Sequence, residues 1–141
     1  MIVLCTMKND LMKSEAMSDF SKLMEEKCMN FAVRITNLCR FLVDEKKENR
    51  ISDQLFRSGT SIGANMAEAQ CAISKKDFTS KVYISLKECN ESLFWLSLLM
   101  RTGYLNKKQY DSIYDDCLEL KRLLATITKT SKERIEIENN K

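Results

Sequence analysis

Residues that interrupt helices are almost missing from this chain, and that shortage limits its fold more than any other feature. The 141 residues include no proline and only three glycines. Proline breaks helices and glycine destabilises them, so their scarcity favours long, continuous helices. No long alternation of Val, Ile and Thr indicates a strand. The sequence therefore predicts a nearly all-helical protein, long enough to form one domain with a real core.

The spacing of apolar residues divides the chain into four amphipathic helices. They are expected to span residues 18–47, 51–72, 75–102 and 107–131. Ser74 and Asn106 suit the N-caps of the third and fourth helices, and Gly103 suits the turn that ends the third. Short connections between long helices imply antiparallel neighbours. The predicted fold is all-α, an antiparallel up-down-up-down four-helix bundle.

The two ends of the chain are expected to lie outside this bundle. Residues 1–17 read as a disordered leader, or as a leader wrongly assigned to the protein, because Met1, Met7, Met12 and Met17 are all candidate start residues. Ser18 or Asp19 suits the first N-cap, so the bundle domain is predicted over residues 18–131. The charged segment 132–141 (KERIEIENNK) is predicted to be a frayed tail.

Each predicted helix also carries an apolar stripe that is expected to form the core. The stripes of the first two helices consist of Phe20, Leu23, Met24, Phe31, Ile35, Leu38 and Leu42, and of Ile51, Leu55, Ile62, Met66, Ala69 and Ile73. The second helix carries a further stripe of small residues at every fourth position: Gly59, Gly63, Ala67 and Cys71. Glycine costs an exposed helix roughly 1 kcal/mol relative to alanine, so a close-packed neighbour is the expected reason for it.

Polar residues mark another edge of the second helix. Arg57, Ser61, Asn65 and Glu68 lie there, and Glu88 and Glu91 of the third helix are their expected partners. Two interpretations remain open, a functional polar site or a hydrogen-bonded network that fixes helix register or lines a subunit contact. We favour the structural network, because interfacial polar groups must find partners.

The sequence offers little material for catalysis or metal binding. The chain has no histidine, and its six cysteines include no CxxC pair. Zinc-type spacing is therefore absent, as are the Glu-x-x-His motifs of di-metal bundles and a histidine base for a nucleophile. We expect no enzyme activity, metal or cofactor. The cysteines are expected to be reduced and buried, which favours the cytoplasm, and no segment has the apolar length of a membrane span.

Charged and aromatic side chains leave a nucleic-acid interpretation open. The net charge is only +3, but Lys46, Lys47, Arg50, Lys107 and Lys108 are expected at one end of the bundle. They form either solvated loop ends or a nucleic-acid rim repeated by a symmetric assembly. Six aromatic residues are either core and interface residues or stacking partners for bases: Tyr83, Phe94, Trp95, Tyr104, Tyr110 and Tyr114.

Residues 57–69 (RSGTSIGANMAEA) resemble a family motif, R-x-x-x-S-I-x-x-N-I-A-E-[AG]. It belongs to four-helix-bundle proteins encoded within intervening sequences of bacterial 23S ribosomal RNA genes. The matched positions are Arg57, Ser61, Ile62, Asn65, Ala67, Glu68 and Ala69. Residues 74–99 and 103–105 match as well, so the resemblance covers roughly residues 27–130. Met66 replaces the usual Ile, and Gly63 stands where many members carry proline.

This resemblance implies a ring-like homo-oligomer, typically a pentamer, with no assigned activity. A related branch is the accessory protein of diversity-generating retroelements, which assists a reverse transcriptase and carries basic surfaces. The expected function is therefore that of a non-enzymatic, self-associating bundle that binds RNA, DNA or a reverse transcriptase-like enzyme. The alternative is a protein-binding adaptor or structural bundle without nucleic-acid affinity.

Overall fold

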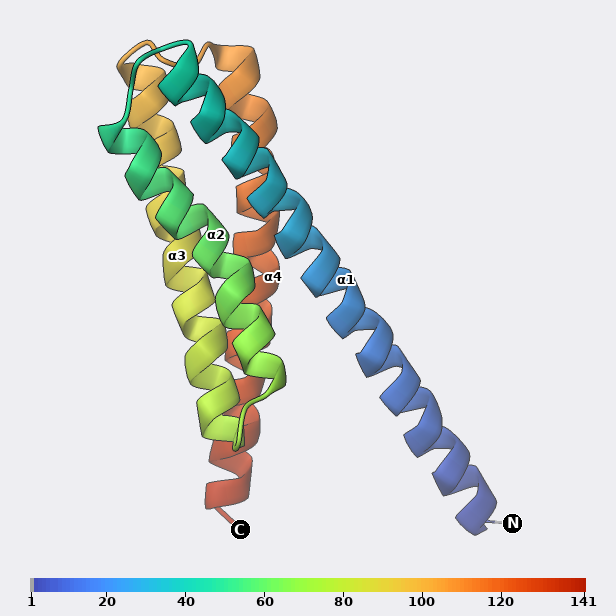
Figure 1. Cartoon of the computed structure of the whole chain (residues 1–141). Coiled ribbons are helices and arrows are strands. Elements are labelled where there is room, and N and C mark those ends of the chain that lie inside the picture. The colour runs from blue at the N-terminus through green and yellow to red at the C-terminus, as the bar shows by residue number, and fades with distance from the viewer. Residues whose placement is uncertain (1) are drawn as a thin grey trace.

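The computed structural model describes the backbone of residues 2–141, together with the side chains of Met12 and of residues 15–141. Its four helices are α1 (Ile2–Asp44), α2 (Arg50–Gln70), α3 (Lys75–Arg101) and α4 (Lys107–Asn139). Successive helices run in opposite directions, up, down, up and down (Figure 1). The predicted all-α, antiparallel four-helix bundle is confirmed.

Local side-chain chemistry fixes both starts that the sequence predicts for the second half of the chain. The Asp77 N–H donates to the Ser74 Oγ at 3.0 Å, which caps α3. The Gln109 N–H donates to the Asn106 Oδ1 at 2.8 Å, and the Asn106 N–H donates to the Gln109 Oε1 at 3.0 Å. This reciprocal capping box starts α4. Gly103, with a φ of +83°, makes the left-handed turn after α3.

The outer ends of α1 and α4 lie further out than predicted. The backbone is helical from Ile2, within the segment expected to be a disordered leader, so Ser18 and Asp19 lie inside α1 instead of capping it. The physical reason is that residues 2–17 contain neither glycine nor proline and are rich in good helix formers such as Met, Leu and Lys. Translation from a later methionine stays a prediction, and Met1 lies outside the described residues.

The C-terminal helix continues in the same way, to Asn139 instead of Ser131. Glu138 in its last turn forms an ion pair with Lys75 at the start of α3, so the expected frayed tail is a helical extension that contacts the bundle. Even so, no helix in residues 2–141 combines the length and hydropathy required to cross a bilayer.

The core lies between residues 24–42 of α1 and the facing stripes of the other three helices. Its largest fully buried side chains are Met24, Phe31, Ile35, Leu42, Leu55, Ile62, Val82, Leu96, Leu99 and Leu124. Phe20, Leu23 and Ile73 were expected in this core but are exposed. The reason is geometric: α1 diverges from the other helices toward its N-terminus (Figure 1), and α2 ends at Gln70.

The two glycines of α2 lie where α1 packs most closely. A Cβ added at Gly59 would lie 2.8 Å from the Ile35 Cγ1 and 2.9 Å from the Ile35 Cγ2. Ile35 is fully buried. Its atoms nearest the added Cβ belong to the branched part of the side chain and not to a flexible end. At Gly63 the nearest atom would be the Cys28 Cβ, at 3.3 Å. At Gly59 the two helices therefore lie too close together for any side chain. At Gly63 the space is less restricted.

We predict that Gly59→Ala destabilises the protein more than Gly63→Ala. Alanine gains roughly 1 kcal/mol of helix propensity at either site. At Gly59 the overlap with Ile35 costs about 1–3 kcal/mol, as overpacked cores do, which opposes or exceeds that gain. Thermal or urea unfolding of both variants tests this difference. An alanine at Gly59 that raises stability as much as one at Gly63 would contradict the close approach.

Candidate assembly and nucleic-acid surfaces

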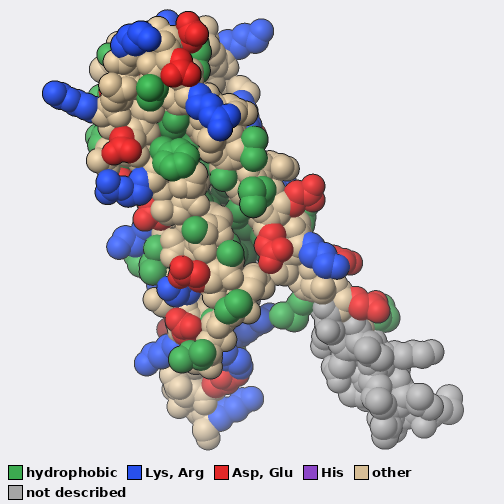
Figure 2. Space-filling model, viewed as in Figure 1, with side chains coloured by type: hydrophobic (Ala, Val, Ile, Leu, Met, Phe, Trp, Pro, Cys, Tyr) green, Lys and Arg blue, Asp and Glu red, His purple; other side chains and the backbone are tan. Residues whose placement is uncertain are grey.

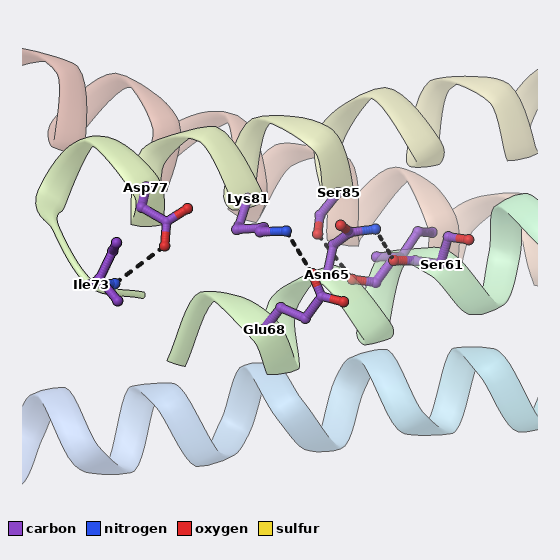
Figure 3. Close-up of polar contacts among 8 residues, drawn as sticks. Ser61, Asn65, Glu68, Ile73, Asp77, Lys81 and Ser85 are labelled. Atoms are coloured by element: carbon purple, nitrogen blue, oxygen red, sulfur yellow. Dashed lines mark hydrogen bonds and ion pairs between the residues drawn. The ribbon is translucent and has the colours of Figure 1, made fainter. Parts of the chain in front are cut away.

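Two of the predicted polar residues of α2 bond to the backbone of their own helix. The Ser61 Oγ donates to the Arg57 carbonyl at 2.6 Å. The Asn65 Nδ2 donates to the Ser61 carbonyl at 2.8 Å (Figure 3). Serine and asparagine satisfy their polar groups in this way without a partner on another helix. These bonds therefore do not join α2 to α3.

The remaining members of the predicted polar set do not complete one network within the chain. Glu68 forms an ion pair with Lys81 of α3 at 2.6 Å (Figure 3). Glu91 instead accepts a hydrogen bond from the Trp95 Nε1 at 3.1 Å, within α3. The side chain of Arg57 is exposed. A role for this set at a contact between subunits stays a prediction.

The surroundings of Glu88 perturb the ionisation of its carboxyl. Its side chain is half-buried on α3, and this burial raises the pKa of the Glu88 carboxyl. The charge of Glu91 raises the pKa further, whereas Lys87 and Arg57 lower it. Arg57 and Glu88 thus interact through charge, and no hydrogen bond between their described side chains joins them.

Buried serines, which sequence reasoning missed, make further polar contacts between α2 and α3. The Ser92 Oγ donates to the Ser58 Oγ at 2.9 Å, and the Ser85 Oγ donates to the Ile62 carbonyl at 2.9 Å. All three serines are fully buried. Their position on the core side of amphipathic helices is the sequence signal that could have identified them. A small hydroxyl there lets two helices approach closely and still finds a hydrogen-bond acceptor.

A carboxylate in the first loop was also missed. The Glu48 Oε1 accepts from the backbone N–H groups of Arg50 at 3.0 Å and Ile51 at 2.9 Å, and its Oε2 accepts from Ser52 at 2.8 Å. These are unpaired donors of the first turn of α2, where a negative charge is favourable. In the sequence, Glu48 stands among six other polar residues of the loop, and nothing distinguishes it as the cap.

The small-residue stripe of α2 divides into an inner and an outer part. Gly59 and Gly63 face α1, as described above. Ala67 and Cys71, the C-cap that follows the helix, are exposed. The close-packing stripe predicted over Gly59, Gly63 and Ala67 therefore contacts α1 through its two glycines, and it continues onto the surface at Ala67.

Exposed apolar side chains flank this helix pair on its outer side. Met29, Val33 and Val43 share one face of α1 by their helical spacing, and Met29 is 64% and Val33 51% exposed. Val43 and the exposed Phe56 of α2 line one groove of about 810 Å³ between the two helices. Figure 2 shows hydrophobic side chains on this side of the molecule, over α1 and α2. We call Met29, Val33, Val43 and Phe56 the α1–α2 face.

The predicted lysine clusters do lie at one end of the bundle, because the α1–α2 and α3–α4 connections share that end (Figure 1). We call Lys46, Lys47, Arg50, Lys107 and Lys108 the basic rim.

Part of this rim is already engaged by neighbouring groups. The Lys47 Nζ donates to the Asp44 carbonyl at 2.7 Å, and Lys107 pairs with Asp111 at 2.7 Å. The Asp111 hydrogen bond is also the main cause that raises the pKa of Lys107. One chain alone therefore presents only a modest positive potential there.

Four of the five described cysteines behave as the small buried residues that the sequence predicts. Cys28, Cys39, Cys89 and Cys117 are buried free thiols, whereas Cys71 is exposed. Burial raises the pKa of the Cys28 thiol to about 12. In residues whose side chains are described, no group of three His, Cys, Asp or Glu is placed to hold a metal. The absence of a metal or cofactor stays a prediction.

This bundle is similar to known proteins in both sequence and structure. A family model described as the 23S rRNA-intervening sequence protein matches residues 23–126. The chain is also similar to the crystal structure, at 1.70 Å resolution, of a protein of unknown function from the S23 ribosomal protein family of Bacteroides thetaiotaomicron. The two are 50% identical with a TM-score of 0.76, over 77% of this chain and 97% of that one. No curated protein matches the chain.

We predict that Glu88→Gln stabilises the protein at neutral pH. A carboxyl whose pKa is raised by folding favours the folded state only while it is protonated. Its contribution is complete below the pKa of the unfolded chain, about 4.3, and is lost as the pH rises through the higher folded pKa. The neutral glutamine keeps that contribution at all pH values.

Thermal unfolding at neutral pH and near pH 3.5 measures the difference, which should be positive at neutral pH and vanish in acid. Glu133→Gln, at an exposed site of α4, serves as the control. A Glu88→Gln protein no more stable than wild type at neutral pH would show that the burial of Glu88 has no energetic consequence.

Proposed function

Because the chain belongs to the 23S rRNA-intervening sequence protein family, we propose that it acts as a non-enzymatic, homo-oligomeric bundle, a ring of five subunits, that binds RNA or DNA. One observation carries the assembly part of this proposal, namely the exposed α1–α2 face. Large apolar side chains that stay in contact with water lose the free energy that burial would provide, about 25 cal/mol per Å². Clusters of them on a surface mark interaction sites.

The composition of this face favours a second copy of the chain as its partner. Charged residues such as Arg40, Asp44 and Asp53 line the groove beside Val43 and Phe56. Small or uncharged residues also lie among the large side chains: Thr36, Thr60, Ala64 and Ala67. Such residues let another helix approach closely, as Gly59 does for α1 inside the chain. A family implied to form rings requires each subunit to present a contact surface of this kind.

The nucleic-acid part rests on the basic rim. A single subunit offers five cations there, offset by nearby carboxylates such as Asp44 and Asp111. A ring would repeat the rim around one end, and phosphate binding strengthens with each cation that displaces a counterion. A reverse transcriptase-like enzyme is the protein partner that the related branch implies. The lack of histidine supports a role other than catalysis, and the reduced thiols suit the cytoplasm.

We predict that Met29→Glu and Val33→Glu dissociate the assembly. Each places a charge in the centre of the α1–α2 face without touching the buried core. Light scattering after size exclusion should give wild-type protein a multiple of 16.4 kDa and the variants the monomer mass. Ile137→Glu, at an exposed apolar site near the end of α4, should keep the wild-type mass. Monomeric wild type, or variants with unchanged mass, would contradict the proposed interface.

We predict that reversing the charge of Lys46, Lys47, Lys107 and Lys108 to Glu abolishes retention on RNA or heparin at low salt. Wild-type retention should fall steeply as salt rises, because counterion release drives the binding. The matched control reverses Lys75, Lys76, Lys129 and Lys141 toward the opposite end. If the wild type is never retained at low salt, the adaptor without nucleic-acid affinity becomes the better description.

A further inference from the structure

Two aromatic rings on α3 are left in water by the fold. Phe94 is 59% exposed and Tyr83 is 46% exposed. The other aromatic residues considered for base stacking, Trp95, Tyr104, Tyr110 and Tyr114, pack against the core and are only partly exposed. The structure thus separates two candidates for stacking from four structural residues, a distinction that helical spacing alone does not make.

Both exposed rings lie on one face of α3 together with cations. Tyr83, Lys87, Asn90, Phe94 and Arg101 follow one another at intervals of four, three, four and seven residues, which keeps them on one side of a helix. Tyr83 and Phe94 are separated by about 17 Å along the axis, from the rise of 1.5 Å per residue. We call these five residues the α3 outer face.

The charges of this face suit an anionic polymer. Lys87 and Arg101 are exposed, and neither forms an ion pair with a described side chain. Lys132 of α4 adds a third cation, with its Nζ 5.0 Å from the centre of the Tyr83 ring. Two carboxylates of α3 lie near this face: Glu91 accepts the Trp95 hydrogen bond, and the half-buried Glu88 interacts with Lys87 through charge. Exposed cations thus alternate with exposed rings along α3, and Lys132 lies over one face of the Tyr83 ring.

We propose that the α3 outer face binds single-stranded nucleic acid, with bases stacked on Phe94 and Tyr83 and phosphates held by Lys87, Arg101 and Lys132. This inference rests on the proposed nucleic-acid function and names a second part of its site. Base stacking on an aromatic ring tolerates any sequence, since every base has a π-face. A duplex keeps its bases stacked on one another, so this face selects single strands.

The position of Arg101 joins this face to the basic rim. It lies in the last turn of α3, at the bundle end that also carries Lys107 and Lys108. A strand captured by the rim therefore passes directly onto the α3 outer face. The α1–α2 face differs in character, because only one of its four large apolar side chains is aromatic and the charged residues beside it, such as Arg40 and Asp53, have both signs. That contrast assigns the subunit contact to one surface and the nucleic acid to the other.

Trp95 provides a built-in probe of this site. It is the single tryptophan of the chain, and its ring centre lies 4.9 Å from that of Phe94, edge to face. We expect an oligodeoxythymidine of about twenty nucleotides at low salt to change the Trp95 emission, and a duplex of equal length to bind more weakly. Anisotropy of the labelled oligonucleotide measures the Kd independently of Trp95.

Variants then separate stacking from general charge attraction. Phe94→Ala and Tyr83→Ala should each raise the Kd for the single strand on the order of 10-fold. Their effect on duplex binding should be much smaller. Tyr83→Phe should retain wild-type affinity because it keeps the ring, and Ile137→Ala is the control for loss of an exposed apolar side chain. Unfolding temperatures confirm that each variant folds.

The outcomes distinguish this inference from the function on which it rests. If the wild type binds in a salt-dependent way and both alanine variants bind as tightly, the α3 outer face is not part of the site, while the proposed function stands. If the wild type binds no oligonucleotide at low salt, both this inference and the nucleic-acid part of the proposed function are wrong. If Phe94→Ala instead lowers the mass of the assembly, the face is a subunit contact and the inference is overturned.

Discussion

Ile35 of α1 lies directly over Gly59 of α2, and this contact determines the distance between the first two helices. No side chain fits at Gly59 without displacing a fully buried isoleucine. Packed interiors do not absorb such a displacement freely, since they are as dense as organic crystals. The close approach holds residues 24–42 of α1 against the bundle, where they supply Met24, Phe31 and Leu42 to the core.

The outward surfaces follow from this arrangement. With Ile35 and Cys28 turned toward α2, helical geometry turns Met29 and Val33 toward water. An apolar surface therefore forms next to the contact between Ile35 and Gly59. On the other side of α2, hydrogen bonds of the buried serines fix the orientation of α3. In this orientation Phe94 and Lys87 of α3 face outward. Packing inside the bundle thus assigns different chemistry to different sides of the molecule.

The sequence predicted best what short-range chemistry decides. The caps at Ser74 and Asn106 and the turn at Gly103 depend on residues no more than three positions apart, and the structure contains all of them. The fold class followed equally well from apolar spacing and the lack of helix breakers. The candidate polar network was harder to predict from the sequence. A serine such as Ser61 can bond to its own helix or to a neighbouring helix, and the sequence pattern is the same in both cases.

Features that depend on contacts between distant parts of the chain could not be predicted from the spacing of apolar residues either. Phe20 continues the apolar stripe of α1, and only the divergence of that helix from the bundle leaves its side chain exposed. Glu48 looks like any loop carboxylate until the backbone brings three N–H groups to it. Likewise, the exposure of Phe94 and the partial burial of Trp95, its neighbour in sequence, depend on where α2 and α4 lie around α3.

Amide hydrogen exchange tests most directly whether α1 and α2 form one packed unit through the contact at Gly59. Amides that open only with the whole fold exchange together, at rates set by the global stability. The slowest amides of residues 24–42 should therefore match those of residues 55–66 in protection. Protection in α1 that is uniformly lower than in α2 and α3, with residues 24–42 exchanging as an independent segment, would contradict this account.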